Sequence, residues 1–171
     1  KMDKHQERYV QHQQNKKDRL LELMKLRYSE RIFSNKEIEL EKLELIVKAS
    51  TLAPSSCDRQ AVTIKIITSR DDKQLISGLL VGGTGGIHRA RVILLLIADG
   101  SAYKEKLGFM PYLDAGFVAQ NIWLECTDLE IQCCFVNPNI RVDHKPVFSI
   151  RYLEDNEILC GALAIGYKDE I

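Results

Sequence analysis

The sequence predicts a single domain of the α+β class, on the strength of three patterns in its 171 residues. Residues 20–50 carry apolar side chains at the spacing of amphipathic helices. Four further runs, rich in β-branched or other apolar residues, have the length of strands. Residues 113–129 are apolar on nearly every side, which is typical of a helix buried in a large core or against a partner subunit.

The composition indicates a folded, water-soluble protein and argues against several other classes. Apolar residues make up 45% of the chain and charged residues 28%, unlike a disordered protein. Lysine plus arginine equals aspartate plus glutamate, at 24 each, so a formal net charge of zero favours neither nucleic acid nor an anionic membrane as a partner. No apolar run reaches the roughly 18 residues that span a bilayer, and no signal peptide is visible, so we expect a cytoplasmic protein.

The positions of cysteine and histidine predict no metal centre. The five cysteines form no C-x-x-C pair and show no zinc-type spacing, and the four histidines are scattered. Free thiols in a reducing cytosol are the simplest interpretation. Three aspartates, Asp99, Asp114 and Asp143, have no evident partner for paired-carboxylate chemistry.

The first fifty residues predict a polar segment followed by two helices. Residues 1–19 are interpreted as a polar N-terminal extension, an exposed helix or a frayed tail, ahead of one domain over residues 20–171. Leucines at helical spacing predict a helix that ends near Arg27. Ser34 and Glu37 match the capping-box pattern Ser-x-x-Glu, which predicts the start of the second helix.

The remainder of the chain is predicted to supply the sheet and two more helices. Strands are expected at 62–68, 91–98, 131–136 and 158–166, and helices at 71–80 and 113–129. The run 91–98 is continuously apolar, which indicates a central strand buried on both faces. Pro111 fits the first turn of the long helix, and residues 138–149 are expected to form a loop with room for one helical turn.

Two guanidinium groups and a hydroxyl follow the first helix, in the sequence R-Y-S-E-R. Arg27, Ser29 and Arg31 admit an ordinary interpretation, a solvated helix end whose arginines interact with the last carbonyl groups. The alternative is a phosphate clamp. A phosphate monoester carries roughly −1.5 to −2 charges, and arginine offers it a planar pair of donors.

A second polar motif, A-P-S-S-C-D-R-Q, follows the second helix, which Pro54 is expected to stop. The ordinary interpretation is a helix stop and a polar loop. The functional interpretation is a row of hydrogen-bonding groups for a ring that carries many polar atoms. Two such motifs about one helix apart are far less expected by chance than either motif alone.

The layout of these motifs resembles the nitroreductase family of flavin-dependent oxidoreductases. The family's Arg-x-Ser-x-Arg/Lys motif is similar to Arg27, Ser29 and Arg31 here. The resemblance implies that Arg27 and Ser29 hold the phosphate of FMN, with Tyr28 beside them. It also implies that Arg31 lies near the N1 and C2 carbonyl edge of the flavin, where a positive charge stabilises the anionic reduced form.

The family's Pro-Ser-Ser-x-Asn-x-Gln motif resembles Pro54, Ser55, Ser56, Asp58 and Gln60. In that family these residues reach the flavin from the other subunit. The resemblance therefore implies an intertwined homodimer, with a mostly antiparallel central sheet wrapped by helices. It extends over about residues 20–167, although only the first two motifs are specific.

Two weaker matches complete the candidate site. The glycine-rich run 82–86, which includes Gly83, has neither the Walker nor the Rossmann spacing. It is either a flexible turn or, by resemblance, a loop that approaches the ribityl chain. The segment 132–137 falls where the family places backbone near the flavin N5, and its candidate contacts are Cys134, Val136 and Asn137.

The activity that the resemblance implies is FMN-dependent transfer of hydride from NAD(P)H to an electron-poor acceptor, by a ping-pong mechanism. The acceptor is expected to be a small molecule, namely a nitroaromatic, a quinone, an enone or a free flavin. Because the cofactor carries the chemistry, no catalytic acid, base or triad is needed. Arg31 is expected to contribute electrostatically.

Three departures from the family pattern keep alternatives open. Asp58 stands where the family has asparagine, Ala61 replaces a proline, and only Lys168 is available as a basic residue after the last strand. One alternative is a degenerate dimer with weak or no flavin binding that acts as a binding or structural protein. Another is an enzyme for a phosphate-bearing ligand that uses the glycine-rich run.

Overall fold

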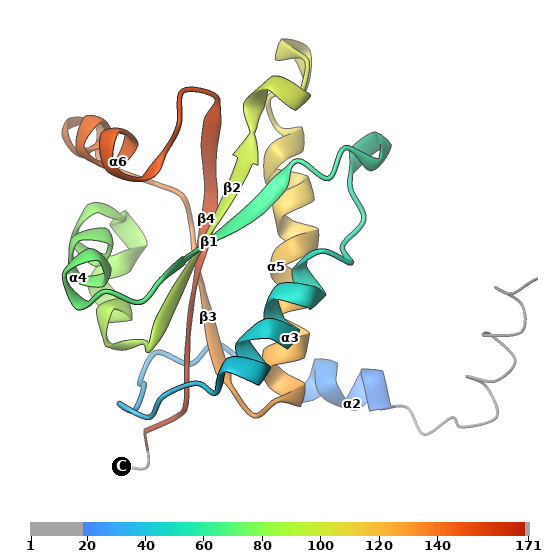
Figure 1. The fold of residues 1–171 in the computed structure, drawn as a ribbon, viewed down its shortest axis with the longest axis vertical. Helices are drawn as coiled ribbons and strands as arrows, with labels where there is room; N and C mark the ends of the chain where they lie inside the picture. The colour runs from blue at the N-terminus through green and yellow to red at the C-terminus, as the bar shows by residue number, and fades with distance from the viewer. Residues whose placement is uncertain (1–18, 170–171) are drawn as a thin grey trace, which may run out of the picture.

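The computed structural model describes residues 19–169, which are organised around a four-stranded antiparallel sheet (Figure 1). The strand order is β1-β2-β4-β3, and each neighbouring pair is antiparallel. The strands are β1 (Val62–Ile67), β2 (Val92–Asp99), β3 (Gln132–Val136) and β4 (Glu157–Gly166). All four lie within two residues of their predicted positions, and the predicted α+β class with an antiparallel sheet is confirmed.

Strand β2 occupies the interior of the sheet, as its continuous apolar sequence predicts. It pairs with β1 on one side and with β4 on the other, and every residue of the strand except Asp99 is buried. Side chains alternate between the faces of a strand. Accordingly, Ile93 and Leu95 belong to one apolar core and Leu94 and Leu96 to the other. The sheet therefore separates two cores, and each core needs its own cover of helices.

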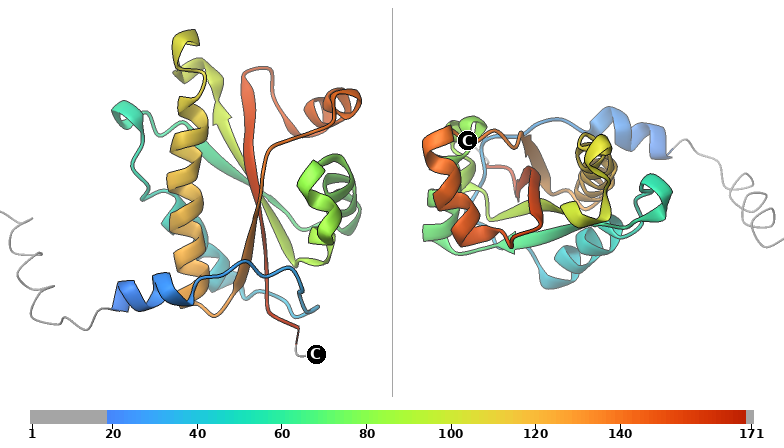
Figure 2. Two further views of the ribbon diagram at one scale, coloured as in Figure 1. Left: turned by 180° about the vertical axis from the view of Figure 1, so that it is seen from behind. Right: turned by 90° about the horizontal axis from the view of Figure 1, so that it is seen from above.

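Helices form one layer on each face of the sheet (Figure 2). Helices α3 (Leu40–Ser50) and α5 (Met110–Asp128) cover one face, where Ile46, Val118 and Ile122 join the core. Helices α4 (Arg70–Leu79) and α6 (Lys145–Tyr152) cover the other face. A short helix, α2 (Arg19–Leu26), lies against the C-terminal part of α5 and contributes no buried residue.

The long helix α5 is confirmed, with Pro111 in its first turn as predicted. One side of the helix packs on the sheet through Val118, Ile122 and other apolar residues. The opposite side leaves Leu113 and Phe117 exposed to solvent. The sequence of this helix is apolar on nearly every side, but one chain buries only one side of it.

The predicted capping box at Ser34 is wrong. Helix α3 begins only at Leu40, and the N-terminal flanking residue, Glu39, makes no side-chain cap hydrogen bond. The Ser34 N–H instead donates to the carbonyl oxygen of Tyr167 at 2.9 Å, and Glu37 pairs with Arg91. Because residues around Ser34 are tied to the end of β4, they cannot enter a helix.

One other segment differs from the prediction. Residues expected to form a loop after β3 contain a short turn and then the eight-residue helix α6, in which Pro146 occupies the first turn and Phe148 and Tyr152 are buried. The glycine-rich run forms one 3-10 turn, Val81–Gly85, followed closely by a second, Ile87–Arg89. The proposed polar extension falls almost entirely outside the described residues. Within residues 19–169, no helix combines the length and apolarity needed to cross a membrane.

Candidate active site

A cleft of about 230 Å³ lies beside β3, at the edge of the sheet. Three segments that are distant in sequence form it, namely the extended residues after α2, the glycine-rich turn after α4, and β3 with the residue that follows it. Its lining consists of Arg31, Gly82, Gly85, Ile87, Cys134, Phe135, Val136 and Asn137. The structure therefore brings together four of the residues singled out in the sequence, Arg31, Cys134, Val136 and Asn137.

Glycine at position 82 allows the turn to approach the end of β3 closely. A Cβ atom at this position would lie 3.1 Å from Cγ1 of Val136 and 3.3 Å from Nδ2 of Asn137. Gly83, the glycine singled out in the sequence, faces α4 rather than the cleft. A Cβ atom there would lie 2.4 Å from the carbonyl oxygen of Ser77, whose hydroxyl donates to the Gly83 carbonyl at 2.7 Å. Gly82 and Gly85 are thus the glycines that line the cleft.

The residues after α2 run beside β3 in an extended conformation. Ser29 forms a parallel bridge with Cys133, and the Glu30 N–H donates to the Cys133 carbonyl at 3.2 Å. Arg31 therefore reaches the cleft, whereas the guanidinium of Arg27 lies over the ring of Trp123 on α5, 4.7 Å from its centroid. This cation–π contact holds the guanidinium against the ring.

A buried carboxylate lies in the middle of the basic motif. Glu30 is 8% exposed, and its carboxylate accepts hydrogen bonds from the backbone N–H groups of Arg31 (2.8 Å) and Ile32 (2.9 Å) and from the Tyr28 hydroxyl (2.9 Å). Burial alone would raise the pKa of Glu30, but these hydrogen bonds and the ammonium of Lys168 at 4.0 Å lower it below its usual value. Glu30 is therefore an ionised anchor for the backbone at Arg31.

Sequence reasoning passed over Glu30, because a glutamate between a serine and an arginine has no distinctive pattern. Its burial follows from the contact of this segment with β3, which is set by tertiary structure. Lys168, two residues after β4, forms a bridge with Phe33 and lies 5.9 Å from the centre of the Tyr28 ring. The extended chain after α2 and its immediate surroundings thus carry three cationic side chains, those of Arg27, Arg31 and Lys168.

The second motif forms a tight turn at the far end of α3. Residues Ser56–Asp58 make a single 3-10 turn, and Cys57, Asp58 and Gln60 all have positive φ angles, of 50°, 52° and 52°. Such angles are uncommon for residues other than glycine and indicate local strain. Hydrogen bonds hold the turn, because the Gln60 N–H donates to the Ser55 hydroxyl at 2.9 Å and the Gln60 amide donates to Asp58 at 2.8 Å.

Asp58 occupies the position where the sequence departs from the family motif. Asp58 forms no ion pair among the described residues, and its carboxylate accepts a hydrogen bond from the Gln60 side chain. The guanidinium of Arg59 donates to the carbonyl and hydroxyl oxygens of Ser56, at 2.8 Å and 2.9 Å. Hydrogen bonds from the side chains of Gln60 and Arg59 therefore both stabilise the turn.

Asp114 ties this turn to helix α5. Its side chain is 1% exposed, and its carboxylate accepts hydrogen bonds from the Ser56 N–H at 2.9 Å and the Tyr103 hydroxyl at 2.8 Å. Burial and the Asp114 carboxylate both raise the pKa of Tyr103, so this hydroxyl remains a donor. Sequence reasoning found no partner for Asp114, because both partners lie at sequence separations that no local pattern reveals.

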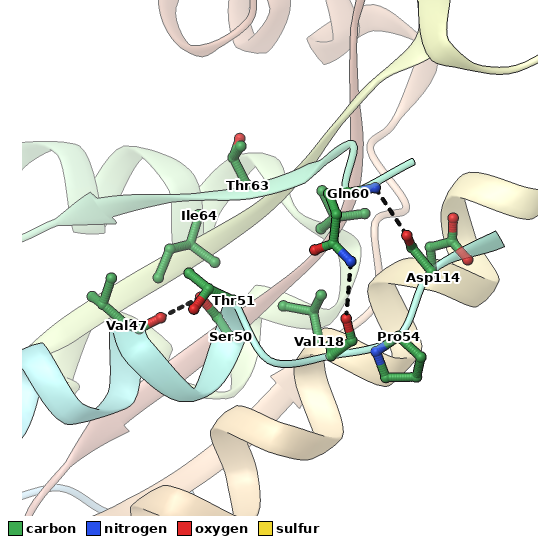
Figure 3. Close-up of a pocket in the computed structure, with 12 residues that line it drawn as sticks. Val47, Ser50, Thr51, Pro54, Gln60, Thr63, Ile64, Asp114 and Val118 are labelled. Carbon is green, nitrogen blue, oxygen red and sulfur yellow. Dashed lines mark hydrogen bonds between the residues drawn. The ribbon is translucent and has the colours of Figure 1, made fainter. Parts of the chain in front are cut away.

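A second cavity, of about 360 Å³, lies between α3, β1 and α5 next to this turn. Figure 3 shows Gln60 and Asp114 near Pro54, at the end of the cavity away from Val47. Most of the lining is apolar, and Ser55 also contributes to it. Four of the predicted site residues therefore adjoin this cavity or its rim, namely Pro54, Ser55, Ser56 and Gln60.

The two motifs do not face one another within one chain. Arg27 contacts α5 at Trp123, whereas Ser56 contacts the same helix at Asp114. Nine residues of α-helix correspond to about 13 Å along the axis. The cleft beside β3 and the cavity beside α3 share no lining residue.

The structure is that of an α+β protein with a cleft, lined by Arg31, at the edge of an antiparallel sheet. Comparison with protein families is more specific. Residues 24–84 and 80–167 match the Nitroreductase family, and the chain belongs to this family. No curated protein sequence matches the chain in the corresponding comparison.

Solved structures share the fold at low sequence identity. A putative NADH dehydrogenase/NAD(P)H nitroreductase from Parabacteroides distasonis is 20% identical, with a TM-score of 0.79 over 91% of this chain and 90% of that one. An FMN-dependent nitroreductase from Clostridium difficile is 24% identical, with a TM-score of 0.76 over 88% of each chain. A nitroreductase with bound FMN from Bacteroides fragilis is 19% identical, with a TM-score of 0.73 over 90% of each chain.

Proposed function

We propose that this chain is an FMN-dependent oxidoreductase that takes hydride from NAD(P)H and delivers it to an electron-poor small molecule. Membership of the Nitroreductase family supports the proposal, and two structures with the same fold are named as FMN-dependent or FMN-bound. The observation that carries it is the cleft in which Arg31 meets Gly82 and the end of β3. Nitroaromatics, quinones, enones and free flavins are the acceptor classes that we consider.

The residues of the cleft fit one edge of a flavin. Arg31 offers guanidinium donors, and the side-chain-free edge at Gly82 and Gly85 allows a flat ring to approach the backbone. In this proposal Arg27 and Ser29 bind the phosphate, and Lys168 adds a positive charge nearby. The cleft volume of about 230 Å³ is below the roughly 300 Å³ typical of small-molecule pockets, so one chain encloses only part of the cofactor.

The missing wall is supplied by a second copy of the chain in this proposal. The separation of the two motifs along α5 supports contribution of Pro54–Gln60 from a partner subunit rather than from the same chain. Exposed apolar side chains provide the contact surface, and they lie on α2 and at the N-terminal half of α5. They are Leu20, Leu21, Met24, Phe109, Leu113 and Phe117. Exposed apolar side chains of this kind are typical of a subunit interface.

The protein contributes binding, orientation and charge. When bound, FMN supplies the hydride chemistry itself. Arg31 would place a positive charge at the ring edge, because it lines the cleft. Glu30 holds the Arg31 backbone in position through two hydrogen bonds. No proton-transfer residue is required from the chain.

The test is the visible absorption spectrum of the purified protein, followed by addition of NADH or NADPH without oxygen. A yellow protein that bleaches with either reductant would support the proposal. The second candidate is a dimer without productive flavin binding, which the carboxylate of Asp58 beside Gln60 favours. A colourless protein whose melting temperature is unchanged by excess FMN would favour that candidate, because a ligand that binds only the native state must stabilise it.

A further inference from the structure

A third cavity, of about 660 Å³, lies on the α4 side of the molecule, and half of its lining residues are basic. It is formed by the start of α4, the turn before β2 and the segment that precedes α3. The residues that matter here are Asn35, Arg70, Lys73, His88, Arg89 and Arg91. Neither of the two motifs discussed above contributes to it. Its volume lies within the range typical of small-molecule sites, roughly 300–1,000 Å³.

Lys73 is the central feature of this cavity. The residue is only 6% exposed, yet its ammonium donates to two backbone carbonyl groups, those of Ala90 at 2.8 Å and Arg91 at 3.1 Å. Among the described residues no carboxylate lies within 4 Å of it. Burial without a counter-charge lowers the pKa of Lys73. One N–H of the ammonium remains for a ligand.

The charges around Lys73 do not cancel. Arg91 is neutralised by its pair with Glu37. Arg70 and Arg89 form no ion pair within residues 19–169, and the carboxylate of Asp169 is the acidic group in the lining. Three unpaired cations against one carboxylate leave about two positive charges in a concave site, where the field is concentrated.

We propose that this cavity binds a small anion that carries a phosphate or diphosphate group. A phosphate monoester brings roughly −1.5 to −2 charges, which matches the excess positive charge. A single carboxylate would leave half of that excess uncompensated. Arginine side chains from two different elements, Arg70 and Arg89, would hold the oxygens that Lys73 does not reach, and Asn35 adds a neutral donor.

This site is separate from the proposed flavin phosphate. The extended segment forms a bridge with β3 at Ser29 and with Lys168, after the end of β4, at Phe33, and Phe33 lines the basic cavity. Four residues of extended chain span about 13 Å. Arg27 and Ser29 therefore lie at the far end of that segment, and the anion in the basic cavity is a second ligand.

Isothermal titration of the FMN-saturated protein with inorganic pyrophosphate tests the proposal, at low ionic strength and with the flavin spectrum recorded throughout. Saturable binding with an unchanged flavin spectrum is expected. Lys73→Met and Arg89→Ala should each weaken it by about tenfold or more, the effect of losing one charge-assisted hydrogen bond. Lys48→Met removes an exposed lysine from α3, on the opposite face, and should leave binding within about twofold.

Several results would overturn the proposal. These are no saturable binding up to about 10 mM pyrophosphate, wild-type binding by Arg89→Ala, or release of flavin as the anion binds. Because Arg89 is exposed, that variant remains informative even if Lys73→Met fails to fold. Succinate serves as the dicarboxylate comparison, and binding as tight as that of pyrophosphate would refute the phosphate class. If the purified chain carries no flavin, the pyrophosphate titration is made on the flavin-free protein. Failure of the flavin proposal therefore does not decide the anion proposal.

Discussion

The backbone N–H of Ser56 donates to the buried carboxylate of Asp114 at 2.9 Å, which joins the turn after α3 to the first half of α5. The other carboxylate oxygen accepts from Tyr103 at 2.8 Å. The turn contains three non-glycine residues with positive φ, so its conformation has to be maintained by contacts of this kind. In the proposed dimer the same turn meets the flavin of the partner subunit, and Asp114 then acts as a positioning residue.

Replacement of Asp114 tests this relationship. Asp114→Ala leaves two partly buried donors, Ser56 N–H and Tyr103 O–H, without their acceptor, so we expect the free energy of unfolding to fall by about 2–4 kcal/mol. Tyr103→Phe removes only one hydrogen bond and should cost about 1 kcal/mol. Urea denaturation at one fixed protein concentration measures both. Equal losses for the two variants would show that the Ser56 hydrogen bond contributes nothing.

Glu30 predicts a specific dependence of stability on pH. Its pKa in the folded protein lies below the usual value of 4.5, despite burial, because of hydrogen bonds from Ile32, Arg31 and Tyr28. A lowered folded pKa means that the contribution to stability is present above pH 4.5 and is lost as the pH falls through the lower folded value. Denaturation curves between about pH 3 and 7 should therefore converge for the wild type and Glu30→Gln at acid pH. Curves that stay parallel over this range would contradict the assignment.

Arg27 is predicted to bind the flavin phosphate. Arg27→Ala should weaken FMN binding by about 1.5–3 kcal/mol, the value of a hydrogen bond to a charged group. Fluorescence titration of the apoprotein with FMN gives the affinity. Arg19→Ala is the matched control, since Arg19 lies on the helix that Arg27 follows, is exposed and pairs with Asp128. Unchanged affinity in Arg27→Ala would exclude the phosphate role.

Arg31 is predicted to act on the reduction potential rather than on affinity. Because it lines the cleft beside Gly82 and Cys134, its charge favours the reduced, anionic cofactor. Arg31→Ala should lower the potential of the bound flavin, and Arg31→Lys should restore most of it. Spectroelectrochemical titration measures this directly. A potential that is the same in all three proteins would reject the electrostatic role.

Sequence patterns correctly predicted the elements whose buried positions recur regularly along the chain. Strand β2 is recognisable because both of its faces are covered, so every position is apolar. Helix α4 shows a regular apolar stripe, and its Ser69 caps the N-terminus by accepting from the Asp72 N–H at 3.3 Å. In such elements the local preference and the tertiary environment agree.

Prediction from the sequence failed where tertiary contacts determine the local conformation or the burial of a residue. The capping box at Ser34 matches its pattern, but the carbonyl of Tyr167 takes the Ser34 N–H and keeps the segment extended. Helix α6 is short and buries mainly Phe148 and Tyr152, which is too little for a periodic signal. In the candidate site, the basic motif was readable as residue types, whereas the burial of Glu30 depends on contact with β3.

The proposed homodimer is testable through the exposed face of α5. Phe117 is 49% exposed and lies among apolar neighbours, so Phe117→Glu should place a charge in the interface and shift the chain towards monomer. The affinity for flavin should fall as the dimer dissociates, since in the proposed dimer one wall of each site comes from the partner. Ile150→Glu is the matched control, because Ile150 is 86% exposed on α6, on the other face of the sheet. Sedimentation velocity measures the oligomeric state of both variants, and FMN titration measures their flavin affinity. A Phe117→Glu protein that keeps the mass and the flavin affinity of the wild type would show that this face of α5 is not where the two copies meet.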